Sequence, residues 1–127
     1  MKVKYSFICD AANVTKSGNL NVLGIFKEIN TTKFPVKCAK FSYVSQIEFH
    51  RSETGKHSFK LNFINEDGKE IIPSLNGEIG VGQNSFYSNL LINLENITFP
   101  AEGVYAIDLT VNNQHLATDL ITLKLVK

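Results

Sequence analysis

The densest group of side chains capable of chemistry lies between residues 50 and 57. His50, Arg51, Glu53 and His57 all fall within this short segment. Two imidazoles and a carboxylate are ligands that zinc and iron accept, so a metal site is the first chemistry to consider. Side-chain alternation in the flanking segments places His57 on their apolar side and His50 on the other side. Because three ligands must converge on one ion, we expect a solvated turn with a surface Arg51–Glu53 ion pair, and no metal site.

The other candidates for catalysis are isolated from one another in the sequence. Cys9 and Cys38 lie in or beside strand-like segments, where a thiol is expected to be a small buried apolar group. A disulfide between them is the alternative, but the N-terminal segment lacks the long apolar core of a signal peptide, so we expect free thiols. His115 follows a turn, and the carboxylates fall on separate loops. No catalytic residue is therefore predicted, and we expect that the protein is not an enzyme.

Two alternating segments flank the turn at residues 50–57. Large side chains recur at every second position in both, which is the pattern of half-buried strands. The positions on the apolar side are Phe41, Tyr43, Ile47 and Phe49 in the first segment, and His57, Phe59, Leu61 and Phe63 in the second. We therefore predict a hairpin over residues 39–65 whose aromatic side faces the core.

Alternation of the same kind predicts strands along most of the remaining chain. These are residues 1–9, 20–26, 69–72, 78–81, 86–94, 105–111 and 115–126. Residues 20–26 are apolar at most positions and are expected to be buried on both faces, with Gly24 at a bulge or a close backbone approach. Residues 27–37 are expected to cross from one sheet to the other, and the strand before Pro73 is expected at a sheet edge. The remainder of residues 74–85 is predicted to be a flexible loop.

Eight or nine short strands without a convincing helical segment predict an all-β protein. At 127 residues and 14.2 kDa, the chain has the size of a single domain that can bury its own core. We expect one domain over residues 1–127, an antiparallel β-sandwich that is immunoglobulin-like or jelly-roll-like.

Composition excludes several classes of partner. The formal charge is +1 and the lysines are scattered, so we expect no nucleic-acid partner, because binding to phosphates usually needs a basic stripe. No apolar run approaches the roughly 18 residues of a membrane span, so no membrane partner is expected. We expect a cytoplasmic protein without a cofactor.

Several turn and core motifs together resemble a known family. They are residues 18–26 (GNLNVLGIF), Phe34-Pro35, residues 53–57 (ETGKH), Asp67-Gly68, Phe99-Pro100 and residues 103–105 (GVY). This combination resembles a family of small uncharacterised bacterial or phage-encoded all-β proteins, a resemblance that implies no known activity. The step from Gly103 to Tyr105 also resembles the corner tyrosine of immunoglobulin-like sandwiches, which implies that its hydroxyl ties a loop to a strand.

Two functional hypotheses follow. The first is a binding or assembly module that contacts itself or another protein through a sheet face or edge. Its basis is the outward face of residues 86–94, which carries Asn89 and Asn93, together with the edge strand near Pro73.

The second hypothesis is a protein that binds or sequesters a small anionic ligand, such as a metabolite or nucleotide. Its site would lie in the loops at residues 27–37 and 74–85, or at an interface between protomers. Lys33, Lys37 and Arg51 would supply donors to the anion, with Glu53 and His57 beside Arg51.

Overall fold

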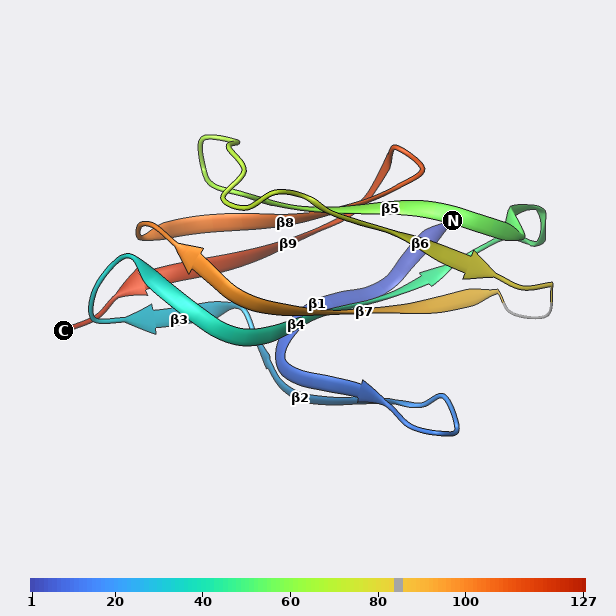
Figure 1. The fold of residues 1–127 in the computed structure, drawn as a ribbon, viewed down its shortest axis with the longest axis horizontal. Coiled ribbons are helices and arrows are strands. Elements are labelled where there is room, and N and C mark those ends of the chain that lie inside the picture. Colours follow the sequence, from blue (N-terminus) through green and yellow to red (C-terminus); the bar gives the residue numbers. More distant parts are fainter. Residues whose placement is uncertain (84–85) are drawn as a thin grey trace.

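The computed structural model describes residues 1–83 and 86–127, which form two stacked β-sheets (Figure 1). The strands are β1 (Lys2–Val14), β2 (Leu20–Phe26), β3 (Glu28–Thr31), β4 (Val36–Glu48), β5 (Gly55–Ile64), β6 (Leu75–Val81), β7 (Tyr87–Phe99), β8 (Gly103–Val111) and β9 (Gln114–Leu125). One sheet has the order β2-β1-β4-β7 and the other β3-β9-β8-β5-β6. Neighbouring strands are antiparallel except β3 and β9, which are parallel. The predicted all-β sandwich is confirmed.

The predicted hairpin over residues 39–65 is wrong in its pairing, although both of its strands exist. β4 belongs to the four-stranded sheet and β5 to the five-stranded sheet, so the chain forms an arch from one layer to the other. The aromatic sides of the two strands face each other across the core, where Phe41 stacks on Phe63. The tip contains one turn of 3-10 helix, η1 (Arg51–Glu53). Alternation is the same in an arch and in a hairpin, because it fixes the face of each strand and not its neighbour.

The predicted burial of residues 20–26 on both faces is also wrong. Leu23 and Ile25 of β2 are 69% and 59% exposed. In Figure 1 the second half of β1 bends out of the lower layer, and β2 follows it as a projecting hairpin. A register shift between Val3 and Tyr5 of β1 changes which side chains face the core: Ile8 packs inward, whereas Tyr5 and its neighbours at alternate positions face outward.

Several strand boundaries also differ from expectation. Residues 69–72 form no strand and contribute a single bridge at Glu70, so the edge strand of this region is β6, after Pro73. β7 continues to Phe99 because Asn96 takes a positive φ of 55°, which resets the alternation without ending the strand. Residues 27–37 were expected to cross once from one sheet to the other; instead they leave the four-stranded sheet after β2, add β3 to the five-stranded sheet and return to the four-stranded sheet at β4. Asn84 and Ser85 of the predicted loop lie outside the described residues.

The core lies between the sheets and is closed at one end by a tyrosine corner. Tyr105 is 4% exposed, and its hydroxyl donates to the carbonyl oxygen of Ala101 at 2.6 Å. The backbone N–H of Ala101 donates back to the same hydroxyl at 3.3 Å, and Phe99 packs edge-on against the Tyr105 ring. This contact confirms the role that the resemblance to immunoglobulin-like sandwiches implied for the tyrosine.

A small polar cluster interrupts the apolar core. The Tyr43 hydroxyl, the Ser45 hydroxyl and one carboxylate oxygen of Asp119 are buried, and within the described residues none has a hydrogen-bond partner. Ser6 also lies near Tyr43. Burial, followed by the charge of Asp119, raises the pKa of Tyr43 well above its ordinary value, so this phenol stays protonated.

Candidate functional site

The turn of residues 50–57 is organised by Glu53. Its Oε1 accepts a hydrogen bond from the backbone N–H of His50 at 2.8 Å and pairs with the Met1 ammonium at 3.0 Å. The His50 hydrogen bond, followed by that of the ammonium, holds the pKa of Glu53 below its ordinary value. The predicted Arg51–Glu53 ion pair is therefore wrong, because Glu53 pairs with the amino terminus instead.

Both ring nitrogens of His57 are hydrogen-bonded to neighbouring residues. Its Nε2 donates to the backbone carbonyl of Glu53 at 2.5 Å, and its Nδ1 accepts from the side-chain amide of Asn112 at 2.7 Å. The ring stacks on Phe49 with centroids 4.9 Å apart. This pattern requires the neutral tautomer with its proton on Nε2 and leaves neither nitrogen for a metal. Among the described residues, no three histidine, cysteine or acidic side chains gather as a metal site.

Arg51 faces a different partner. Its guanidinium lies 5.4 Å from the centre of the Phe86 ring, within the range of a cation–π contact. Phe86 is held there by its backbone carbonyl, which accepts from the N–H of Phe49 at 2.6 Å. Arg51, Thr54, Gln83 and Phe86 line an open cavity of about 520 Å³.

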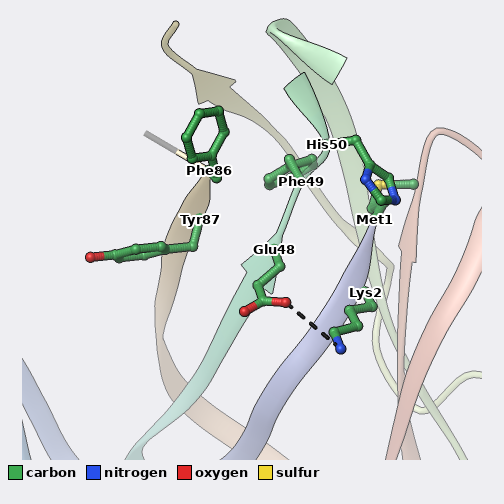
Figure 2. Close-up of a pocket in the computed structure, with 7 residues that line it drawn as sticks. All are labelled: Met1, Lys2, Glu48, Phe49, His50, Phe86 and Tyr87. Atoms are coloured by element: carbon green, nitrogen blue, oxygen red, sulfur yellow. Dashed lines mark ion pairs between the residues drawn. The ribbon is translucent and has the colours of Figure 1, made fainter. Parts of the chain in front are cut away.

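Phe86 also lines a second cavity, of about 630 Å³. Figure 2 shows Phe86 and Tyr87 on one side of it and Met1 and His50 on the other. The Lys2–Glu48 ion pair, at 3.8 Å, lies below them. The lining thus combines exposed aromatic rings with charges of both signs, a composition compatible with a planar anionic molecule.

The five predicted ligand-binding residues do not form one site. Lys33 precedes β4 and Lys37 is the second residue of that strand. Arg51, Glu53 and His57 follow the other end of β4. β4 contains 13 residues, which at about 3.3 Å each separates the two groups by roughly 40 Å. Only the second group lies beside the aromatic cavities.

A third histidine lies in a polar row on the outer face of the five-stranded sheet. The Thr118 hydroxyl donates to Asp108 Oδ1 at 2.5 Å and accepts from His115 Nε2 at 2.8 Å. Because the hydroxyl proton points at the carboxylate and the imidazole acts as donor, this arrangement does not activate Thr118 as a nucleophile.

The two cysteines are free thiols, as expected. Cys9 is fully buried and Cys38 only partly. Burial raises the pKa of both thiols, which makes them less reactive as nucleophiles.

The outer face of the four-stranded sheet is apolar along its centre. Phe7, Val44 and Leu91 occupy one cross-strand row on β1, β4 and β7. The neighbouring rows are polar but internally bonded: Gln46 donates to Asn89 at 3.1 Å, and Ser42 donates to Asn93 at 2.8 Å. The predicted outward direction of Asn89 and Asn93 is therefore correct.

This apolar centre continues onto the β1–β2 hairpin. Ala11 pairs with Leu23 and Cys9 with Ile25, so Leu23 and Ile25 share the outer face with Phe7. We call Phe7, Ala11, Leu23, Ile25 and Leu91 the outer apolar face; Val44 lies in the same row but is fully buried. β2 is also an edge strand, whose second side is unpaired among the described strands. Sequence reasoning missed this surface because an uncharged apolar strand reads as buried whether or not another layer covers it.

Gly24 allows the close contact between β1 and β2. Its φ is +67°, and a Cβ built there would lie 2.2 Å from a carboxylate oxygen of Asp10. The prediction of a bulge or a close backbone approach at Gly24 is therefore wrong: the β1–β2 register is continuous, and the group that lies close to Gly24 is the Asp10 side chain.

Comparison with known proteins places the chain in a family but gives no activity. The model of a family of unknown function (DUF6941) matches residues 4–124. No curated protein matches the sequence.

Two solved structures are similar in part. The alkylpurine DNA glycosylase AlkC of Pseudomonas fluorescens, bound to DNA containing an abasic site analog, is 12% identical with a TM-score of 0.49. The match covers 94% of this chain but 30% of the glycosylase, so this chain spans under a third of that protein. An immunoglobulin-like protein from Pseudomonas aeruginosa is 10% identical with a TM-score of 0.41, over 97% of this chain and 95% of that one.

Proposed function

The chain belongs to this family of unknown function, and we propose that it is a binding or assembly module. It acts through the outer apolar face and the free edge of β2. The observation that carries the proposal is the exposure of Leu23 and Ile25, at 69% and 59%, on an edge strand without a charged residue. Natural proteins usually protect such an edge with charges, proline or a covering segment, and β2 has none of these in the described structure.

The other sheet edges are protected in these ways. β3 has four residues, and its Glu28 pairs with Lys124 of β9 at 3.1 Å. β6 carries Glu78, and the Ser88 hydroxyl of β7 donates to the Gly80 carbonyl of β6 at 3.3 Å, which links those two edges. The difference between β2 and these strands supports a role in binding for β2.

The proposed role is not enzymatic. Support comes from the full occupation of His57 and from the hydroxyl of Thr118, whose proton points at Asp108. We place the protein in the cytoplasm, where free thiols such as Cys9 and Cys38 persist. The described chain contains no helix long and apolar enough to span a membrane.

The test compares three tagged proteins in a cell that also makes an untagged copy. They are the wild type, the double variant Leu23→Lys/Ile25→Lys and the control Leu120→Lys, whose side chain is 57% exposed on β9 of the other sheet. We expect a co-purified species, either the untagged copy or another protein, with the wild type and the control but not with the double variant. Recovery that is absent, or equal for all three proteins, would overturn the proposal.

A second candidate function rests on the cavities beside Phe86. A small planar anion could stack on Phe86 and pair with Arg51. Thermal-shift measurements with nucleotides and aromatic carboxylates would show stabilisation that Arg51→Met removes. Equal shifts for the wild type and the variant, or no shift for either, would exclude this site.

A further inference from the structure

We infer that the partner of the β2 edge is the β2 edge of a second copy of this chain. The two copies would be related by a two-fold axis, and their four-stranded sheets would join into one continuous sheet. This inference rests on the proposed function, because it names the occupant of the same surface.

The accessible surface of the chain is the first support. It measures 7692 Å², whereas a compact monomer of this mass would expose about 6,800 Å². The excess of about 900 Å² is close to the roughly 800 Å² per partner that a standard stable interface covers. The projecting β1–β2 hairpin contributes to this surface, since Leu23 and Ile25 on it are 69% and 59% exposed (Figure 1).

The geometry of β2 is the second support. β2 is antiparallel to β1, so a two-fold copy of β2 continues the antiparallel order of the sheet. The seven-residue strand is centred on Leu23, and full overlap therefore places Leu23 opposite its own counterpart. On the same face Ile25 then lies opposite Asn21, so the exposed apolar side chains of the two copies meet near the axis.

The distribution of charge is the third support. Residues 17–26 contain no charged side chain. In the same register Lys27 lies opposite Asn19, so the pairing opposes no like charges. A second copy thus supplies a free edge of equal length and an apolar face, and its approach brings no like charges together.

Sedimentation velocity on the purified chain, from about 1 μM to about 1 mM, tests the association. We expect a monomer–dimer equilibrium whose dissociation constant rises at least about tenfold in Leu23→Lys and is unchanged in Leu120→Lys. Leu23 is exposed, so its substitution should leave the fold intact, which thermal unfolding of both variants checks.

A cysteine at the axis tests the geometry directly. In a Cys38→Ser background, which leaves only the buried Cys9, we expect Leu23→Cys to form an intermolecular disulfide on mild oxidation. Directly opposed residues of antiparallel strands lie about 4.5–5.5 Å apart at Cα, within disulfide range. Leu120→Cys is the control and should stay monomeric under the same oxidation.

The outcomes separate the inference from the proposed function. Two results would show that a second copy is not the partner. One is a wild type that stays monomeric at every concentration, and the other is a dimer that Leu23→Lys does not weaken and Leu23→Cys does not trap. If the purified chain is monomeric but the cellular partner is still lost in Leu23→Lys/Ile25→Lys, the inference fails and the proposed function stands. If neither association depends on Leu23, both fail.

Discussion

Phe41 of β4 and Phe63 of β5 stack across the core, with ring centroids 6.4 Å apart and planes inclined by 12°. Both rings are buried, at 2% and 3% exposure, and they belong to different sheets. Their contact therefore joins the two layers and fixes the connection between β4 and β5 as an arch.

A double-mutant cycle on this pair measures the contact. We expect Phe41→Ala to lower the free energy of unfolding by about 3–5 kcal/mol, because it removes a buried ring and leaves a cavity. Phe41→Leu and Phe63→Leu should show a coupling energy of about 0.5–1.5 kcal/mol. Urea titrations of Phe41→Ala and of the four proteins of the cycle, which are the wild type, the two leucine variants and their double variant, give these values. Strictly additive effects in the cycle would contradict a direct stack.

The two buried tyrosines should respond in opposite ways to loss of the hydroxyl. Tyr43 has a buried hydroxyl without a partner, so Tyr43→Phe should leave the free energy of unfolding unchanged or raise it by up to about 1 kcal/mol. Tyr105→Phe removes the hydrogen bond to the Ala101 carbonyl and should lower the free energy of unfolding by about 1–2 kcal/mol. Denaturant unfolding measures both, and a marked loss in Tyr43→Phe would indicate that the nearby Ser45 or Ser6 hydroxyl, or a buried water, bonds to the Tyr43 hydroxyl.

The contribution of Glu53 to stability should depend on pH. Its folded pKa is lowered, so the ionised carboxylate favours the folded state above the ordinary glutamate pKa. This contribution falls as the pH drops through the lowered value and is absent below it. We expect Glu53→Gln to have a lower urea midpoint than the wild type at pH 7 and an equal one near about pH 2. A difference that persists in acid would indicate a packing effect instead.

Gly24 should tolerate no side chain. Gly24→Ala combines an unfavourable positive φ, which costs about 1–2 kcal/mol, with a clash against Asp10. In an Asp10→Ala background the carboxylate is gone. We therefore expect the loss of stability in Gly24→Ala to fall toward the contribution of the positive φ alone. Thermal unfolding of the single and double variants measures this, and equal penalties in both backgrounds would show that Asp10 does not approach Gly24.

Much of the fold could be predicted from local pattern. Alternation identified both strands of the arch, and it placed Leu90, Ile92 and Leu94 on the inward side of β7. The corner tyrosine was also identified from the sequence, because Gly103 and Tyr105 form a local motif. These features depend on the period of the strand and on short-range turn chemistry, both of which are properties of neighbouring residues.

The candidate sites were predicted less well, because each depends on contacts between distant segments. The aromatic cavity needs Phe86 beside Arg51, and the Glu53 ion pair needs the amino terminus beside the turn. Lys33 and Lys37 resembled partners of Arg51 by charge alone, and the length of β4 separates them from it.

The sequence by itself determined that this chain is a β-sandwich with a mostly apolar interior and a polar turn at residues 50–57. Only the tertiary structure decided which strands are neighbours and which apolar strand lacks a covering layer. The physical reason is that hydrophobic burial has no direction: the same alternating side chains are satisfied by a hairpin, an arch or a second molecule. Leu23 and Ile25 show this most clearly, because their apolar character is evident in the sequence and their exposure only in the fold.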